Sequence, residues 1–236
     1  MATLLFVRHG QASAFTGGDY DQLSPLGEQQ AAALGRWLAG RDQRFARVFV
    51  GPRRRHAQTH DAIVAAYREA RLPLPEHVVL ESLDETDGPL AIAKNLSNLA
   101  ERFPEVRDAM AAAGSSGDPR GWLRALQTVV RLWSRGELDA AGLPTWRDFR
   151  ATVAGALDRM VAELPKGDRV LVLTSGGTTA AALAHALDLD DDRAVDLMLA
   201  LRNAAFSTIR VARDRLQLGS FNEVPHLPDE SMHTLV

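Results

Sequence analysis

Ala2-Thr3-Leu4-Leu5-Phe6-Val7, followed at once by Arg8-His9-Gly10, is the stretch that decides the fold. Six residues without polar alternation predict a central parallel strand that is covered on both faces. Because ligands of open α/β sheets lie beyond the carboxyl ends of such strands, we expect Arg8 and His9 at that edge. Arginine offers a planar fork for an oxyanion, neutral histidine offers a nucleophilic nitrogen, and Gly10 lets the backbone come close. The stretch therefore favours an α/β fold with phosphate chemistry.

Length and composition limit the class of protein. With 236 residues, 46% hydrophobic and 24% charged, the chain can bury a sizeable core, and one domain over 1–236 is expected. The net charge of −3 argues against nucleic acid or an anionic membrane as partner, so an anion site must be local. The absence of cysteine excludes a disulfide framework. With no apolar run of membrane length and no secretory leader pattern, we expect a cytoplasmic protein.

Periodicity predicts strands that alternate with helices along the chain. The predicted helices cover 25 to about 40, 54 to about 70, 145–164 and 176 to about 187, and the predicted strands cover 2–7, 47–50, 77–80, 169–174, 203–211 and 216–221. Residues 90 to about 142 also have a helical pattern, interrupted at Pro104 and at 114–119. The acidic stretch 188–192 is expected to be a solvated turn, because it lacks the glycine of a calcium loop.

Two further strand-to-helix junctions carry groups suited to anions. Arg53, Arg54 and Arg55 follow the predicted strand 47–50, and a helix N-terminus with an added arginine favours phosphate. We expect Arg53 and Arg54 to form a solvated face. The predicted strand 169–174 ends in Ser175-Gly176-Gly177, where a second phosphate contact is expected.

The sequence predicts no metal site and no cofactor. His56 and His60 stand four residues apart on a predicted helix, but no glutamate lies between them as a zinc-protease motif requires. We therefore expect both histidines to lie at the surface or at the rim of the site.

In order along the chain, these motifs resemble the histidine phosphatase superfamily, the phosphoglycerate mutase-like group, from Arg8 to Leu227. Gly51-Pro52-x-x-Arg55-x-x-Gln58-Thr59 resembles the family's Ser-Pro-x-x-Arg-Ala-x-Gln-Thr-Ala, and Leu83-Asp84-Glu85 resembles its Leu-x-Glu. Other matches are Leu23-Ser24, Gly27, Gln30-Ala31, Leu34-Gly35, Asn222 and His226-Leu227. We expect His226 to be a further residue at the rim of the site. The polar tail from Pro228 is expected to be loose. The resemblance implies a three-layer α/β sandwich with a mostly parallel sheet, helices on both faces, an antiparallel edge and a helical cap insertion at about 88–147.

The resemblance also implies roles for site residues. His9 attacks the phosphoryl group and forms phosphohistidine, while Arg8 and Arg55 hold the nonbridging oxygens without a metal. Glu85, with Asp87 as the alternative, protonates the leaving alkoxide, because an alcohol leaves poorly as an anion. The family's Gly-x-Trp-Glu-Gly continuation is replaced by Gly88-Pro89, which ranks phosphatase above phosphomutase. The expected partner is a small phosphorylated substrate or phosphate.

One position departs from the family's Ser-His-Gly-Gly, because Ser175 stands where its second histidine is usual. Losing one preorganised donor typically costs roughly 100- to 1000-fold in rate. Two interpretations follow. Ser175, with the backbone N–H groups of Gly176 and Gly177, serves an active variant of the site, which we favour, or the protein binds phosphate compounds as a weak or inactive pseudophosphatase.

Overall fold

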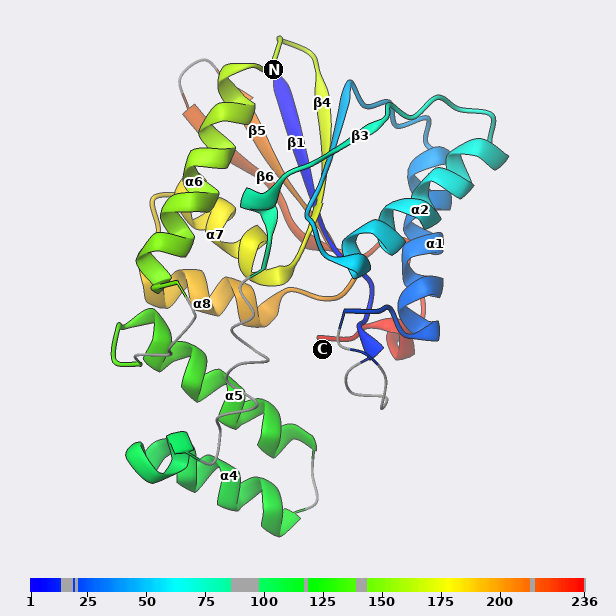
Figure 1. Ribbon diagram of the computed structural model, residues 1–236. Coiled ribbons are helices and arrows are strands. Elements are labelled where there is room, and N and C mark those ends of the chain that lie inside the picture. The colour runs from blue at the N-terminus through cyan, green and yellow to red at the C-terminus, as the bar shows by residue number, and fades with distance from the viewer. Residues whose placement is uncertain are drawn as a thin grey trace.

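The computed structural model describes residues 1–13, 19, 21–85, 98–116, 119–138, 144–212 and 215–235. Its centre is a six-stranded sheet in the order β3-β2-β4-β1-β5-β6 (Figure 1). The strands are β1 (Ala2–Arg8), β2 (Arg47–Val50), β3 (His77–Val79), β4 (Arg169–Thr174), β5 (Phe206–Ala212) and β6 (Arg215–Glu223). β5 runs antiparallel to both β1 and β6, and the other neighbours are parallel. The predicted mostly parallel sheet with a hairpin at its edge is confirmed.

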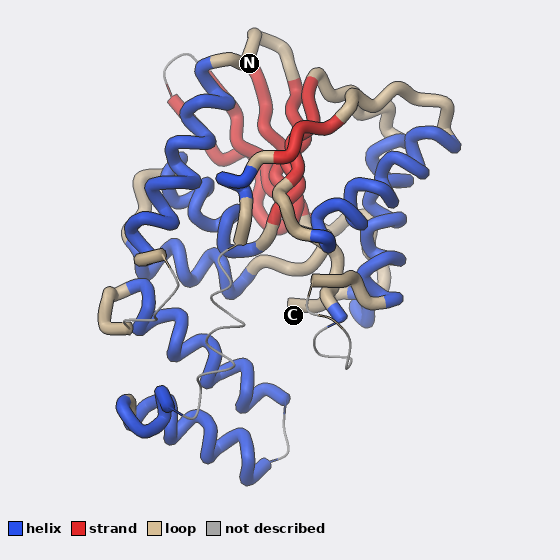
Figure 2. Tube along the Cα trace, viewed as in Figure 1, coloured by secondary structure: helices blue, strands red, loops and turns tan. Residues whose placement is uncertain are grey.

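Helices cover both faces of the sheet and complete three layers (Figures 1 and 2). One face carries α1 (Pro25–Ala39) and α2 (Arg54–Glu69), and the other carries α6 (Trp146–Ala162) and α7 (Gly176–Ala186). The structure also describes helices α4 (Pro104–Ser116), α5 (Pro119–Ser134) and α8 (Asp191–Ala200), with short 3₁₀ turns η2 (Glu81–Leu83) and η3 (Glu230–Met232). The α/β class is therefore as predicted.

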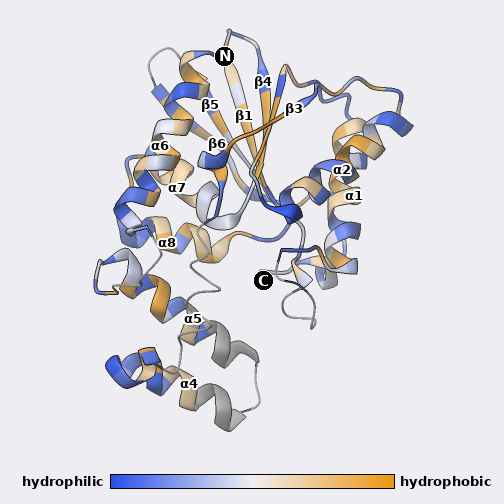
Figure 3. Cartoon of the chain, in the orientation of Figure 1, coloured by the Kyte–Doolittle hydropathy of each residue, from blue (hydrophilic) through white to orange (hydrophobic). Residues whose placement is uncertain are grey.

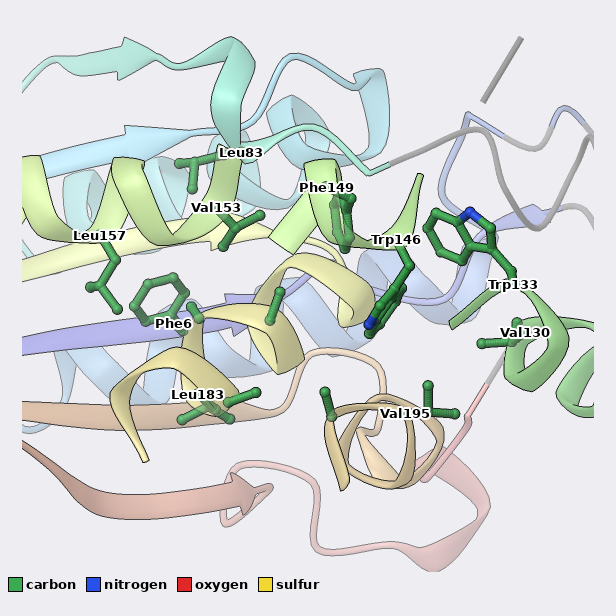
Figure 4. Close-up of a cluster of buried hydrophobic side chains, with 14 of the residues drawn as sticks. Phe6, Leu83, Val130, Trp133, Trp146, Phe149, Val153, Leu157, Leu183 and Val195 are labelled. Atoms are coloured by element: carbon green, nitrogen blue, oxygen red, sulfur yellow. The ribbon is translucent and has the colours of Figure 1, made fainter. Parts of the chain in front are cut away.

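Alternate side chains of β1 pack into two different hydrophobic cores. Leu4 and Phe6 join the cluster beneath α6 and α7, where Phe6 lies near Leu183 (Figure 4). Leu5 and Val7 point the other way, into the cluster beneath α1 and α2. Apolar residues are accordingly concentrated in the strands (Figure 3). This burial on both faces is the reason for the unbroken apolar run, and it fixes the end of β1 at the centre of the carboxyl edge.

The start of α1 packs tightly against the loop that follows β1. The Ser24 hydroxyl caps the helix by accepting a hydrogen bond from the Gly27 N–H at 3.0 Å. Gly27 lies so close to this loop that a Cβ atom there would stand 2.1 Å from the Gln11 carbonyl oxygen. A Cβ atom at Gly10 would likewise stand 2.3 Å from the Gly27 carbonyl oxygen. The two glycines therefore allow the helix to hold the loop that begins at the carboxyl edge of the sheet.

Residues 188–192 correct a sequence prediction. The acids are exposed to solvent, as predicted, but 190–192 begin α8 instead of continuing a turn, because the Asp190 carboxylate accepts a hydrogen bond from the Arg193 N–H at 2.8 Å. Asp191 and Asp192 lie in the first turn, where the helix dipole favours acids. Asp191 also accepts a hydrogen bond from the Trp146 indole at 2.8 Å. Asp190, Asp191 and Asp192 thus form the start of α8, and Asp191 joins this helix to α6.

The C-terminal segment and His226 correct two further expectations. The tail is held, because the Asn203 N–H donates to the Thr234 carbonyl at 2.8 Å and the Gln30 amide donates to the Met232 carbonyl at 2.7 Å. His226 is 7% exposed, and its ring packs against Phe206 with centroids 6.3 Å apart. It is a packing residue and not a rim residue.

The region predicted as a cap contributes α4 and α5, which lie beyond the carboxyl ends of the strands (Figure 1). α5 meets α8 through an ion pair between Arg131 and Asp196 at 2.7 Å, and Trp133 packs edge-on against Trp146 with centroids 5.0 Å apart. Residues 88–97, 117–118 and 139–143 of this region lie outside the described part of the chain. Among the helices that the structure describes, none combines the length and apolarity that a bilayer span requires.

The glycine contact at the start of α1 generates a stability prediction. Gly27→Ala is expected to lower the free energy of unfolding by roughly 1–3 kcal/mol, because its Cβ must displace backbone. Gly155→Ala in α6 is the matched control, since the nearest atom to its Cβ would be the Arg159 Nη1 at 3.6 Å. That variant should gain about 0.5–1 kcal/mol from helix propensity. Urea unfolding measures both, and equal effects of the two substitutions would contradict the prediction.

Candidate active site

Parallel strand register brings three segments to one point of the sheet edge. The His9 N–H donates to the Thr174 carbonyl at 2.9 Å, which aligns the ends of β1 and β4. The Gly51 N–H donates to the Leu173 carbonyl at 2.9 Å, which aligns the end of β2 with the same strand. The residues that follow β1, β2 and β4 therefore meet at the carboxyl edge, where ligand sites of open α/β sheets lie.

His9 is buried, and its two ring nitrogens have different partners. Nδ1 lies 2.6 Å from the Gly10 carbonyl oxygen, which only accepts hydrogen bonds. Nε2 lies 3.1 Å from the Arg55 Nε, which only donates. These partners require a proton on Nδ1 and a lone pair on Nε2. The ring is therefore held in the tautomer that leaves the Nε2 lone pair directed toward Arg55.

The electrostatic surroundings keep His9 uncharged. Burial, together with the positive charges of Arg55 and Arg8, holds the pKa of His9 well below its ordinary value of 6.5. The hydrogen bond to the Gly10 carbonyl opposes this shift, but burial is the largest cause. A neutral ring is the form that can attack an electrophile.

The Arg55 guanidinium joins the groups of the site. It is 1% exposed, and besides His9 it donates to the Asp21 carboxylate at 3.0 Å. Its Nη2 lies 3.4 Å from the Ser175 hydroxyl and 3.5 Å from the Glu85 carboxylate. The side chain comes from the first turn of α2. This helix is joined to the loop after His9, because the Gly10 N–H donates a hydrogen bond to the Thr59 hydroxyl at 3.2 Å. The Arg55 guanidinium thus contacts His9, Asp21, Ser175 and Glu85, which come from four different segments.

Glu85 lies at the N-terminus of α7. Its Oε1 accepts a hydrogen bond from the Gly177 N–H at 3.0 Å, and its side chain is 12% exposed. A Cβ atom at Gly177 would stand 2.6 Å from Oε1, so the glycine is what allows the carboxylate this close approach. Asp87, the alternative acid, lies outside the described residues.

Arg8 lies along the other side of the α7 N-terminus. Its Nη1 donates to the Leu201 carbonyl at 2.5 Å, and its Nε would stand 3.3 Å from a Cβ atom at Gly176. The structure therefore brings Arg8, His9, Arg55, Glu85, Ser175 and Gly176 to one place, and their chemical roles remain predictions.

Two expectations for the first turns of α2 are wrong. Arg53 is not part of a solvated face, because its guanidinium donates to both Asp84 oxygens at 2.5 and 2.9 Å and to the Glu85 carbonyl at 3.0 Å. It thereby holds the loop that presents the acid. Arg54 is exposed as predicted.

His56 and His60 are not surface residues, since they are 0% and 5% exposed. His60 packs on the His77 ring with centroids 4.3 Å apart, and the His56 Nε2 lies 2.7 Å from the Ser175 hydroxyl. Helical spacing places both side chains on the inward side of α2, and polarity alone misplaced them. The described residues hold no group of three or more metal-ligating side chains.

Sequence reasoning also missed Asp21, whose carboxylate accepts from the Arg55 side chain at 3.0 Å and from the Arg54 N–H at 3.0 Å. It lies in an aperiodic loop that offers no local signal, and only proximity to α2 reveals it. His56 had a detectable signal, because it directly follows the arginine selected by the motif.

A buried neutral histidine beside an arginine, at the carboxyl edge of a three-layer α/β sheet, defines a class of site suited to reaction with anionic groups. The model of the histidine phosphatase superfamily (branch 1) matches residues 4–224. The chain therefore belongs to the histidine phosphatase superfamily. The comparison with curated proteins found no match.

Solved structures share the fold. A phosphoglycerate mutase from Bacillus anthracis is 19% identical, with a TM-score of 0.67, over 96% of this chain and 95% of that one. A mycobacterial glucosyl-3-phosphoglycerate phosphatase complexed with VO3 is 21% identical, with a TM-score of 0.61, over 93% and 98%. A phosphoserine phosphatase from Entamoeba histolytica in complex with 3-phosphoglyceric acid is 18% identical, with a TM-score of 0.60, over 96% and 100%.

The partners of His9 predict its behaviour in solution. Because its pKa lies well below 6.5, the ring should remain neutral, with the proton on Nδ1, at about pH 5.5. Long-range ¹H–¹⁵N NMR should show an unprotonated Nε2 and a protonated Nδ1 for the signal that is lost in His9→Ala. The same protein unfolded in urea is the control, with ordinary histidine titration. A His9 signal that titrates near 6.5 would contradict the assignment.

Proposed function

We propose that the protein is a phosphomonoester hydrolase that works through a phosphohistidine intermediate on His9. The observation that carries this proposal is the His9 Nε2 lone pair, held 3.1 Å from the buried Arg55 guanidinium. A nucleophile and a phosphate-binding cation are thereby adjacent before substrate arrives, which lowers the entropic cost of reaction.

In the first step, Nε2 forms a bond to phosphorus while the bond from phosphorus to the substrate oxygen breaks. The phosphorylated ring becomes cationic. The Gly10 carbonyl oxygen, 2.6 Å from Nδ1, stabilises this cation by accepting a hydrogen bond from the Nδ1–H. Protonated Glu85 gives its proton to the departing alkoxide. In the second step, water attacks phosphorus, its proton passes to the Glu85 carboxylate, and the His9 lone pair is restored.

Binding of the phosphoryl group requires an exchange of partners at Arg55. Its Nε donates to His9 and its Nη2 faces Ser175 and Glu85, so phosphoryl oxygens must take over these donors as they arrive. Arg8, at the α7 N-terminus, supplies a second guanidinium, and the helix N–H groups of Gly176 and Gly177 add further donors. Two cations meet the phosphoryl charge, so we propose that hydrolysis needs no metal.

The substrate class that we propose is a small phosphorylated metabolite. The site is local and buried, and α4 and α5 lie beyond the strand ends, where a cap would restrict access to small molecules (Figure 1). The related phosphoserine phosphatase structure contains 3-phosphoglyceric acid, a small phosphorylated acid of this kind. Hydrolysis is preferred to phosphomutase action because the sequence lacks the Gly-x-Trp-Glu-Gly continuation.

The nucleophile is tested by His9→Ala. Phosphate release from an aryl phosphate and from a panel of metabolite phosphates should fall by roughly 10⁴-fold or more, since the covalent route is lost. Acid-labile phosphohistidine, trapped with ³²P-labelled substrate, should vanish as well. His185→Ala, at an exposed histidine on α7, is the matched control and should retain full turnover. Turnover should also be unchanged by EDTA. A wild type without turnover at any pH that still binds vanadate would favour the pseudophosphatase instead.

The general acid is tested by leaving-group dependence. Glu85→Gln should lower kcat on alkyl phosphates by roughly 10²- to 10⁴-fold, because alkoxides need a proton. On nitrophenyl phosphate the loss in the first step should be small, since nitrophenolate leaves as an anion. Glu81→Gln, an exposed acid of η2, is the matched control, and Asp87→Asn tests the alternative acid. A first-step rate, measured as the pre-steady-state burst of released alcohol or nitrophenolate, that falls equally on both substrates would exclude Glu85 as the leaving-group acid.

A further inference from the structure

Ser175 shares its hydroxyl between two buried side chains. The residue is 0% exposed at the end of β4, and its Oγ lies 2.7 Å from the His56 Nε2 and 3.4 Å from the Arg55 Nη2. The arginine can only donate, so Oγ accepts that bond. The direction of the bond to His56 therefore decides whether the hydroxyl proton is available to another acceptor.

His56 places a second imidazole beside the nucleophile. It follows Arg55 on α2, is 0% exposed, and its ring centroid lies 5.7 Å from that of His9. Burial and the charge of Arg55 lower the pKa of His56 to about 3, against an opposing interaction with the Gly51 backbone, so the ring is a neutral hydrogen-bonding group. If its Nε2 carries the proton and donates to Oγ, the Ser175 proton is directed to a third group.

Gly51 provides the space that the His56 ring occupies. A Cβ atom at Gly51 would stand 2.4 Å from the His56 Nδ1 and 2.7 Å from the Leu83 carbonyl oxygen. Compared with the family motifs that the chain resembles, positions 51, 56 and 175 carry glycine, histidine and serine in place of serine, alanine and histidine, and His60 replaces a further alanine. His56 adjoins both Gly51 and Ser175, so the departures at these three positions form one rearrangement.

We propose that His56 is a positioning residue for phosphoryl transfer, which orients the Ser175 hydroxyl toward a phosphoryl oxygen and so supplies from α2 the imidazole that position 175 lacks. The His56 Nε2–H donates to Oγ, Arg55 donates to the same oxygen, and the Ser175 proton then bonds the phosphoryl group. This inference rests on the proposed hydrolase function.

A reciprocal exchange tests the proposal with nitrophenyl phosphate as substrate. His56→Ala should lower kcat by roughly 10- to 100-fold with a smaller change in KM, since a preorganised donor is lost in the transition state. Ser175→His alone should also lower kcat, because two rings compete for one buried space. The double variant should exceed both single variants and approach the wild type, which is strong non-additivity between contacting residues.

Two variants separate positioning from packing. His56→Gln keeps an amide that can bond the Ser175 hydroxyl and should recover part of the kcat lost in His56→Ala, whereas His56→Leu should not. His60→Ala, one turn further along α2 and 5% exposed, is the matched control that should affect stability without changing kcat. Thermal unfolding checks that each variant is folded, and His56→Gln keeps the test decisive if the alanine variant is not.

The outcomes distinguish this inference from the function on which it rests. If the wild type is active, two results would overturn the role of His56 and leave the hydrolase proposal standing. These are a His56→Ala variant that keeps full kcat, and a double variant that is no better than either single one. A wild type without turnover and without acid-labile phosphohistidine would overturn the hydrolase proposal, and the present inference with it.

Discussion

A buried guanidinium is the constraint around which the site is arranged. Arg55 is 1% exposed, and an unpaired buried charge costs several kcal/mol, so its neighbours have to satisfy it. Asp21 and Glu85 supply negative charge, and His9 supplies a lone pair. These groups come from a loop, from the segment after η2 and from the end of β1. One arginine thus ties together segments that are remote in sequence.

The same arrangement explains why the site is prepared for an anion before one binds. The Glu85 carboxylate contacts both the α7 N-terminus and Arg55, which are groups suited to hold phosphoryl oxygens. The arrangement also discourages protonation of His9, because the positive charges of Arg55 and Arg8 add to the effect of burial. The two cations therefore favour the neutral form of His9, and a substrate phosphoryl group exchanges with contacts of similar chemistry.

Local sequence signals predicted the parts of this structure that depend on neighbouring residues along the chain. The apolar runs of β1 and β4 gave two central strands, and Ser24 with Pro25 gave the start of α1. The start of α8 was missed because exposed acids were assigned to a turn, although Asp190 caps the helix and Asp191 accepts a hydrogen bond from Trp146. Arg53 was misplaced for a similar reason, since its partner Asp84 lies on another segment.

The departure at Ser175 shows why a motif read in one dimension misjudges chemistry. Taken alone, serine for histidine looks like the loss of a donor. In space, Ser175 is bonded to His56 at 2.7 Å, and His56 fits because position 51 has no side chain. No linear pattern links positions 51, 56 and 175, because strand register and the first turn of α2 bring them together. The chemical groups available at a site therefore depend on which side chains reach it in space, whichever helix or strand carries them.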